Sequence, residues 1–376
     1  MDYSVLHDFI DSIPIRWGVP GCQCAVTIGH QRVFYCATGF RDAARIVPVS
    51  ADDLYWIYSV SKLFTCVSAM QLIESGKLRL DDPVSRYLPL WADMNFLKGK
   101  EVVPSTVQPT VFHLMTMTAG LNYDIKTPTF RNLAIRTARR FTLRDMADAL
   151  AEPPLDFEPG AHFQYSLCHD VLGAIIEEVS CMDLQSYIRK NIGDPLGAND
   201  LTFFPSREQL KRLSAQYRFD PRKNSIERMR RRNRYIIAPT CASAGAGLCA
   251  GINELSLLAD ALANGGVGST GERILAESSI RRMSQDSLTQ NQKSDFWCMK
   301  PAPYSYGLGV RTLTRDDRGA PQGEFGWDGA AGAYVLIDPN RQMSLVYTQH
   351  IMEFGPVYSE IHPQLRDALY RAVGAS

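Results

Sequence analysis

The sequence lacks the charge imbalance and the apolar runs that mark several classes of protein. Its 40 Lys and Arg residues balance 40 Asp and Glu residues, so we expect neither a nucleic acid nor a membrane surface as its main partner. The N-terminal stretch has no basic region and no long apolar run, so we expect no signal peptide and no transmembrane helix. One basic run stands out, and we interpret it as a solvated surface segment: Arg228, Arg230, Arg231, Arg232 and Arg234.

Metal-binding and secretory cysteine patterns are also missing. The seven His residues form no His-Glu-x-x-His motif, and Cys22-Gln23-Cys24 lacks a usual zinc spacing. The sequence therefore predicts no metal and no other cofactor. Nine cysteines without a secretion signal suit reduced, mostly buried thiols, so we expect a cytoplasmic protein. No Gly-x-Ser-x-Gly occurs, which argues against the nucleophile elbow of α/β-hydrolases.

The chain has 376 residues, which exceeds the usual size of a protein with a single hydrophobic core. Residues 22–28 and 31–38 predict a β-hairpin that turns at Gly29-His30. Further segments have strand-like composition, at 304–312, 333–337 and 343–348. Helical spacing occurs over 3–16, 59–75, 142–151, 168–180, 253–264 and 361–373.

Strands at both ends of the chain, with helices between them, predict an α/β fold with a discontinuous sheet domain. We assign residues 1–56 and 237–376 to that domain and residues 57–236 to a mainly helical domain inserted in it. The active site is expected at the junction of the two domains.

The chain contains one Ser-x-x-Lys tetrad, Ser59-Val60-Ser61-Lys62, at the start of an apolar helical segment. Residues three apart on a helix share a face, so the Ser59 hydroxyl and the Lys62 amine should lie within contact reach. A serine needs a neighbouring base to become a nucleophile. Apolar neighbours desolvate the lysine and lower its pKa, which makes its neutral amine a usable base. An ordinary helix start, with Ser59 as N-cap, is the alternative reading of the tetrad alone.

Several ordered segments around this tetrad resemble the penicillin-recognising serine hydrolases. The nearest branch looks like the class C β-lactamases and the family VIII carboxylesterases. The resemblance runs from about residue 20 to residue 350 and is carried by residues 76–84, 87–89, 113–121, 159–166 and 245–248. It implies a β-lactamase-like fold, in which an antiparallel sheet is flanked by helices and carries a large helical insertion.

The resemblance also implies roles for individual residues. Tyr165-Ser166-Leu167 matches the second element of the family, Tyr-x-Asn, with Leu167 in place of the asparagine. We expect a nearby ammonium to favour the Tyr165 phenolate, which could then accept the Ser59 proton and later give one to the leaving group. A buried structural Tyr is the alternative.

The third element, usually Lys-Thr-Gly on an edge strand, corresponds to Trp327-Asp328-Gly329. The family comparison places the backbone N–H of Ala330 beside that of Ser59 as an oxyanion hole. We expect Trp327, Gly329 and Leu167 to line the substrate pocket. Two further residues, Asn122 and Tyr123, follow the turn at Gly120 and are expected to border it.

These observations predict a serine hydrolase that acts through an acyl-enzyme on esters or related small acyl compounds. Leu167 and Trp327 both depart from the β-lactamase pattern in the direction of esterases. A β-lactamase or D-Ala-D-Ala-type peptidase is the first alternative, and a non-catalytic binding protein on the same scaffold is the second. Water, an alcohol or an amine could accept the acyl group, and the oligomeric state is left open.

Overall fold

The computed structural model describes residues 1–230, 233, 235–236 and 238–374. Within the basic run, Arg228 and Arg230 are exposed, as a solvated segment requires. The other members of the run, Arg231, Arg232 and Arg234, lie outside the described residues. The predicted domain boundary at residue 237 lies outside them too, and the division into two domains stays a prediction.

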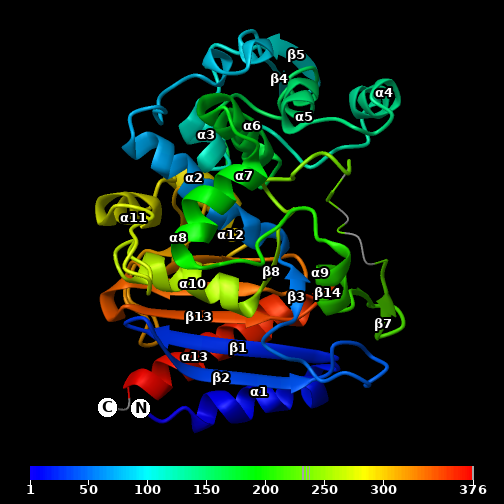
Figure 1. The fold of residues 1–376 in the computed structure, drawn as a ribbon. Helices are drawn as coiled ribbons and strands as arrows, with labels where there is room; N and C mark the ends of the chain where they lie inside the picture. The colour runs from blue at the N-terminus through cyan, green and yellow to red at the C-terminus, as the bar shows by residue number, and fades with distance from the viewer. Residues whose placement is uncertain (231–232, 234, 237, 375–376) are drawn as a thin grey trace.

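Strands gather toward the two ends of the described chain, and the helices α3 to α9 follow one another between them (Figure 1). The α-helices are α1 (Ser4–Trp17), α2 (Ser61–Glu74), α3 (Val111–Met115), α4 (Pro128–Arg136), α5 (Leu143–Leu150), α6 (Cys168–Ser180), α7 (Leu184–Ile188), α8 (Asp194–Leu196), α9 (Arg207–Arg212), α10 (Ile252–Ala263), α11 (Glu277–Ser284), α12 (Gln290–Trp297) and α13 (His362–Gly374). The strands are β1 (Gly21–Ile28), β2 (Gln31–Gly39), β3 (Leu54–Trp56), β4 (Asn95–Lys98), β5 (Glu101–Pro104), β6 (Tyr217–Asp220), β7 (Ser225–Arg228), β8 (Cys249–Gly251), β9 (Tyr304–Tyr306), β10 (Arg311–Leu313), β11 (Phe325–Asp328), β12 (Tyr334–Asp338), β13 (Met343–Thr348) and β14 (Ile351–Met352). Short helical turns complete the set: η1 (Tyr58–Val60), η2 (Val84–Arg86), η3 (Pro89–Trp91), η4 (Arg189–Gly193), η5 (Pro339–Arg341) and η6 (Val357–Ile361).

The main sheet joins strands from the two ends of the chain. In the described part of the chain its order is β2-β1-β13-β12-β11-β10-β9, and each neighbouring pair is antiparallel. The predicted hairpin of β1 and β2 is confirmed. Gly29 and His30 have φ values of 52° and 68° there, the left-handed conformation that a two-residue hairpin turn requires.

Helices cover both faces of this sheet. On one face, α1 packs against β1 and β2, and α13 packs beside α1 (Figure 1). Their apolar residues form one core with the sheet, which includes Leu6, Ile10, Leu365 and Leu369. On the other face lies α10, followed by α2 and the helical region. A larger core spans that face and the helices above it. Because helices cover both faces of the sheet, β11, β12 and β13 are buried along their whole length.

The strand expected over 304–312 is two strands. β9 and β10 form a hairpin, and the chain reverses at Gly309, whose φ is 82°. Gly309 also leaves no room for a side chain, because an added Cβ would lie 2.1 Å from the Cys66 sulfur. Period and composition alone do not reveal such a reversal inside an apolar segment.

Smaller sheets surround the main one. β6 and β7 pair with β14, β3 pairs with β8, and β4 pairs with β5. β3 leads directly into η1 and α2, so the pairing of β3 with β8 fixes where α2 starts. No helix among the described residues is both long and apolar enough to cross a membrane.

Candidate active site

The tetrad lies where the chain passes from β3 into α2. Ser59 is in the short turn η1, directly before α2 begins at Ser61. The preceding residue, Tyr58, has a φ of 48°, a left-handed conformation that is costly for a residue with a large side chain. The chain therefore bends sharply before Ser59, whose side chain is 9% exposed. As predicted, the helix ends just before Gly76, whose φ is 68°.

Lys62 is fully buried and contacts three groups. Its Nζ lies 3.3 Å from Ser59 Oγ, 3.2 Å from Tyr123 Oη and 2.7 Å from the Gly245 carbonyl oxygen. Burial lowers the pKa of Lys62 from 10.5 to about 8, against the opposing effect of Asp170. The predicted contact between Ser59 and Lys62 is thus present. The alternative of an ordinary helix start with a solvated lysine does not fit, because Lys62 is buried.

Two residues near Lys62 were not predicted from the sequence. Asp170, on α6, accepts hydrogen bonds from Ser243 Oγ at 2.8 Å and from the Gly245 backbone N–H at 3.3 Å. Gly245 lies between that carboxylate and the lysine: an added Cβ would be 2.7 Å from Asp170 Oδ2 and 3.3 Å from Lys62 Nζ. A side chain here would push against the Asp170 carboxylate and the Lys62 amine, so a glycine keeps these two groups in place. The buried Asp170 places a negative charge near the ammonium and so favours its charged form.

Tyr165 lies beside Lys62, but its hydroxyl is held by other groups. The indole N–H of Trp327 donates to Tyr165 Oη at 2.9 Å, and Lys62 Nζ lies 4.6 Å from the centre of the Tyr165 ring. Burial raises the pKa of Tyr165 far above 10, against the opposing effects of Ser59 and Trp327. The expected phenolate is therefore corrected: burial raises the pKa of Tyr165 more than the hydrogen bonds of Ser59 and Trp327 lower it, which favours the neutral phenol.

The third element lies on β11, which is an internal strand rather than the edge strand that we expected. β10 pairs with β11 only at Phe325 and Gly326, so Trp327 and Asp328 extend past its end and leave that side open. Gly329 follows, and an added Cβ there would lie 2.3 Å from the Ile57 carbonyl oxygen. A side chain would thus separate this segment from the turn that carries Ser59.

These elements enclose a cavity of about 440 Å³ with Ser59 on its wall. Of the predicted residues, Tyr123, Tyr165, Trp327, Gly329 and Ala330 line it with Ser59. The other lining residues are Tyr235, Ala246, Met299, Lys300, Asp328 and Tyr358. Ser59 and Ala330 therefore face one space, as the oxyanion-hole prediction requires. Trp327 is 2% exposed, so it is a buried cavity wall and not a surface aromatic.

Leu167 and Asn122 do not lie among the described lining residues of this cavity, which corrects two predicted contacts. Leu167 directly precedes α6, and its side chain is 4% exposed within the apolar core. The Asn122 amide donates to Asp156 Oδ1 at 2.9 Å and accepts from the Asp124 backbone N–H at 2.8 Å. The amide oxygen of Asn122 thus stabilises its own turn, and the amide nitrogen links that turn to Asp156.

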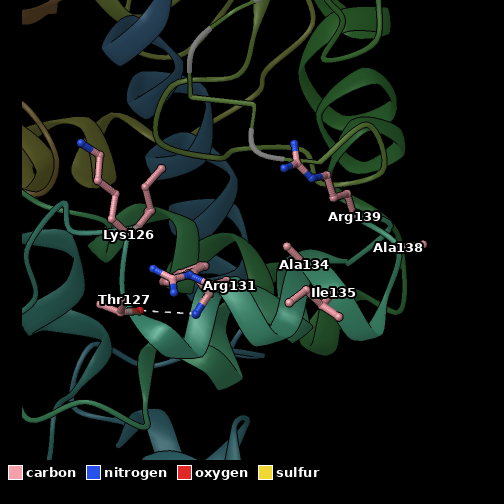
Figure 2. Close-up of a pocket in the computed structure, with 9 residues that line it drawn as sticks. Lys126, Thr127, Arg131, Ala134, Ile135, Ala138 and Arg139 are labelled. Carbon is pink, nitrogen blue, oxygen red and sulfur yellow. Dashed lines mark hydrogen bonds between the residues drawn. The ribbon is translucent and has the colours of Figure 1, made fainter.

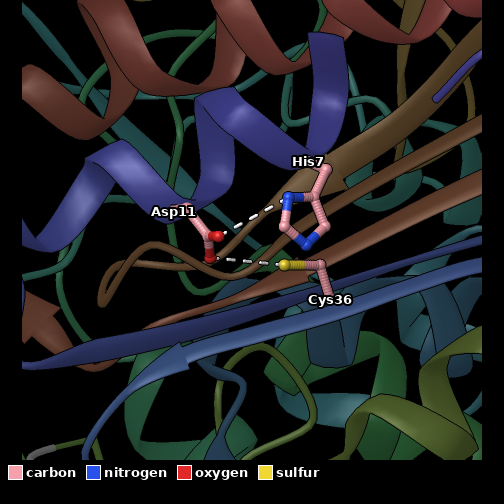
Figure 3. A group of neighbouring side chains, drawn as sticks. All are labelled: His7, Asp11 and Cys36. Atoms are coloured by element: carbon pink, nitrogen blue, oxygen red, sulfur yellow. Dashed lines mark hydrogen bonds and ion pairs between the residues drawn. The ribbon is translucent and has the colours of Figure 1, made fainter. Parts of the chain in front are cut away.

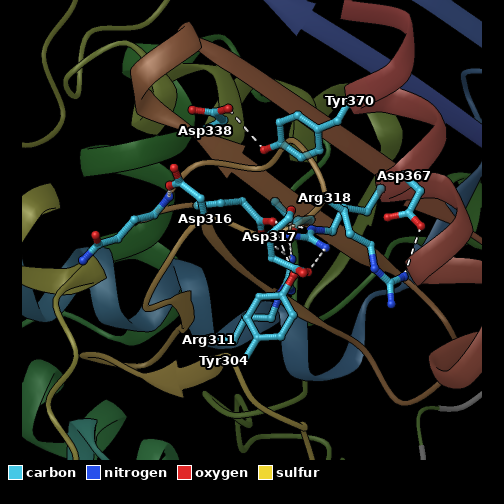
Figure 4. Close-up of polar contacts among 12 residues, drawn as sticks. Tyr304, Arg311, Asp316, Asp317, Arg318, Asp338, Asp367 and Tyr370 are labelled. Carbon is cyan, nitrogen blue, oxygen red and sulfur yellow. Dashed lines mark hydrogen bonds and ion pairs between the residues drawn. The ribbon is translucent and has the colours of Figure 1, made fainter. Parts of the chain in front are cut away.

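Charge on the cavity wall comes from an ion pair. Lys300 Nζ lies 2.8 Å from Asp328 Oδ2, and Arg311 Nη1 lies 3.5 Å from Asp328 Oδ1. Arg311 belongs to a buried polar cluster behind β11, where it lies beside Tyr304 (Figure 4). Glu324 joins Arg311 to Arg366 of α13 within that cluster. Lys300 was not predicted, because it comes from the loop after α12.

A larger cavity of about 770 Å³ lies beside α4 (Figure 2). Its described lining residues include Lys126, Arg131 and Arg139 but no serine or cysteine. The serine–lysine contact, rather than cavity size, therefore identifies the candidate active site.

A family model described as Beta-lactamase matches residues 7–369 of the chain. The chain belongs to the beta-lactamase family. The predicted recognition and the predicted β-lactamase-like fold are thereby confirmed. The matched range contains every element of the site described above.

Relatives of this beta-lactamase-family chain include an esterase and a protein whose name states no activity. Protein Rv1367c of Mycobacterium tuberculosis is 29% identical over 334 residues, which cover 82% of this chain and 80% of that protein. Esterase EstB of Burkholderia gladioli is 32% identical over 186 residues, which cover 48% of this chain and 46% of that enzyme. The solved structure of EstCE1, a hydrolase with promiscuous acyltransferase activity, covers 97% of both chains with a TM-score of 0.79. At 24% identity that likeness shows the fold.

Proposed function

We propose that this beta-lactamase-family protein is a serine hydrolase that forms an acyl-enzyme on Ser59 and acts on neutral esters or related acyl compounds. One observation carries the proposal: a buried lysine whose pKa is lowered contacts the hydroxyl of a serine on a cavity wall. The esterase EstB, a relative whose match covers 48% of the chain, supports esters as the substrate class.

The contacts of Lys62 explain how a neutral amine would act as the base. A neutral amine has two N–H donors and one lone pair. The Gly245 carbonyl can only accept, and it takes one N–H. The Tyr123 hydroxyl can accept the other. The lone pair then points to the third partner, the Ser59 hydroxyl, and takes its proton as the oxygen attacks the substrate carbonyl.

Tyr165 would act as a phenol in this mechanism. Its pKa is raised by burial, so it donates a proton or a hydrogen bond and does not accept the Ser59 proton. We assign it to the leaving-group oxygen, with Trp327 fixing its position. The backbone N–H groups of Ser59 and Ala330 are assigned to the oxyanion; removing one such donor typically costs about 2.7–4 kcal/mol of transition-state stabilisation.

The cavity wall supports a neutral substrate. Lys300 is the one cation among the described lining residues, and Asp328 already neutralises it at 2.8 Å. A substrate carboxylate would have to compete with Asp328 for that ammonium, and a carboxylate without a cation is costly to desolvate. This arrangement disfavours a β-lactam or a peptide C-terminus. A charge-assisted hydrogen bond contributes about 1.5–3 kcal/mol, or roughly ten- to a hundredfold in affinity.

Side-by-side kcat/KM values for short p-nitrophenyl esters and a chromogenic cephalosporin test the proposal. We expect the esters to be turned over faster. A cephalosporin preferred by about tenfold or more would instead favour a β-lactamase. The absence of turnover and of any covalent adduct would favour a binding protein. If an added alcohol speeds release of p-nitrophenol and the acyl group leaves as an ester of that alcohol rather than as the free acid, the same intermediate also supports acyl transfer.

Our proposal extends to the setting of the enzyme. All nine cysteines are free, and seven of them are buried, which suits a reducing compartment. We therefore propose a cytoplasmic enzyme whose partner is a small acyl substrate and not a nucleic acid or a membrane.

A further inference from the structure

Three metal-ligating side chains meet on the side of the sheet that carries α1 and α13. His7 and Asp11 lie one turn apart on α1, and Cys36 lies on β2, the edge strand beneath that helix (Figure 3). Each offers one ligand atom, and these atoms lie within 4.8 Å of one another. The cluster is remote from the chemistry proposed above, because the cavity with Ser59 lies on the other face of the sheet.

The separations of these atoms suit a small tetrahedral cation. His7 Nδ1 lies 3.5 Å from Asp11 Oδ2, and Cys36 Sγ lies 3.7 Å from Asp11 Oδ1. Zinc binds nitrogen and oxygen at about 2.0–2.2 Å and sulfur at about 2.3 Å, so tetrahedral ligand atoms are about 3.3–3.8 Å apart. The His7–Asp11 and Cys36–Asp11 separations fall in this range, each to a different carboxylate oxygen, and a cation would draw the three side chains together.

The local charge also favours a cation. Besides Asp11, the Asp8 carboxylate lies 3.9 Å from His7 Nδ1. A divalent cation bound between Asp11 and Cys36 would favour the Cys36 thiolate as its ligand.

We propose that His7, Asp11 and Cys36 form a zinc-binding site that links α1 to the edge strand β2. The cation binds the His7 imidazole, the Asp11 carboxylate and the Cys36 thiolate, and a water molecule completes the tetrahedron. Binding breaks the S–H bond of Cys36 and forms a sulfur–metal bond, and the proton goes to the solvent. No oxidant or reductant takes part.

Cobalt(II) titration of the chelator-treated protein tests the site, because tetrahedral cobalt with a thiolate ligand gives a sulfur-to-metal charge-transfer absorption. We expect one equivalent of cobalt to produce this absorption and zinc to displace it. His7→Ala changes an exposed helix position and should weaken binding at least tenfold, since loss of an outer-shell partner alone costs about 10–100-fold. Cys36→Ser should abolish the charge-transfer absorption.

Two controls make the result specific. His30→Ala removes another histidine that pairs with a carboxylate, that of Asp260, and should leave the titration unchanged. A protein with both exposed cysteines, Cys181 and Cys298, changed to Ser should keep the absorption. The proposal is overturned if the wild-type protein gives no thiolate absorption, if Cys36→Ser retains it, or if the Cys181/Cys298 variant loses it.

Discussion

The pH dependence of acylation follows directly from the surroundings of Lys62. Burial lowers its pKa from 10.5 to about 8. At pH 7 about one lysine in ten is then neutral, compared with about one in three thousand at the ordinary value. This shift corresponds to about 3 kcal/mol. It raises the fraction of molecules with a competent base by about three-hundredfold.

Because the neutral amine of Lys62 is the proposed base, the rate of acylation should rise with pH. Below the pKa of Lys62, kcat/KM for an activated ester should rise about tenfold per pH unit, and it should level off near pH 8. The carboxylate of Asp170 raises the pKa of Lys62. Asp170→Asn removes that charge, so the midpoint should move to a lower pH.

A stopped-flow or plate assay of p-nitrophenyl ester hydrolysis across pH 6–10 measures both profiles. Asp260→Asn, which removes a buried carboxylate that contacts His30 instead, is the matched control and should keep the wild-type midpoint. A lower plateau in Asp170→Asn with an unmoved midpoint would mean that Asp170 acts only on structure. A wild-type midpoint near pH 10 would refute the reasoning, because Lys62 would then be an ordinary lysine.

Three further predictions concern the surroundings of the site. Trp327→Phe removes the hydrogen bond to Tyr165 and should lower kcat about tenfold with little change in KM, as steady-state kinetics would record. Glu324→Gln removes a buried carboxylate that pairs with both Arg311 and Arg366. Each arginine keeps one other acid, Asp328 and Asp317, so the free energy of unfolding should fall by about 3 kcal/mol, the lower end of the range for a broken buried ion pair, in urea titrations. Ester hydrolysis should persist after extensive chelation; a loss that zinc restores would argue for a metal-dependent reaction.

Local sequence patterns were sufficient for most secondary structure. The helix predicted over 168–180 is α6, and the strand predicted over 343–348 is β13, each at the predicted bounds. Both segments have strong apolar periodicity or strong β-propensity. The tetrad likewise placed Ser59 and Lys62 in contact, because three residues of helix fix their geometry.

The remaining parts of the site depend on contacts between distant segments. Asp170 reaches the Lys62 region from another helix, and nothing in its own sequence neighbourhood distinguishes it from an ordinary first-turn acid. Lys300 likewise meets Asp328 only through the tertiary fold. The Tyr165 phenolate was wrongly expected because the sequence indicated a neighbouring cation but not the extent of burial.

The central claim is that Ser59 is the residue that carries the acyl group. Exposure of the protein to a fluorophosphonate or a slowly hydrolysed activated ester, followed by peptide mass mapping, tests it directly. The account predicts one adduct, on Ser59, and none in Ser59→Ala, which should also lose esterase activity. An adduct on another serine, or full activity in Ser59→Ala, would contradict the account.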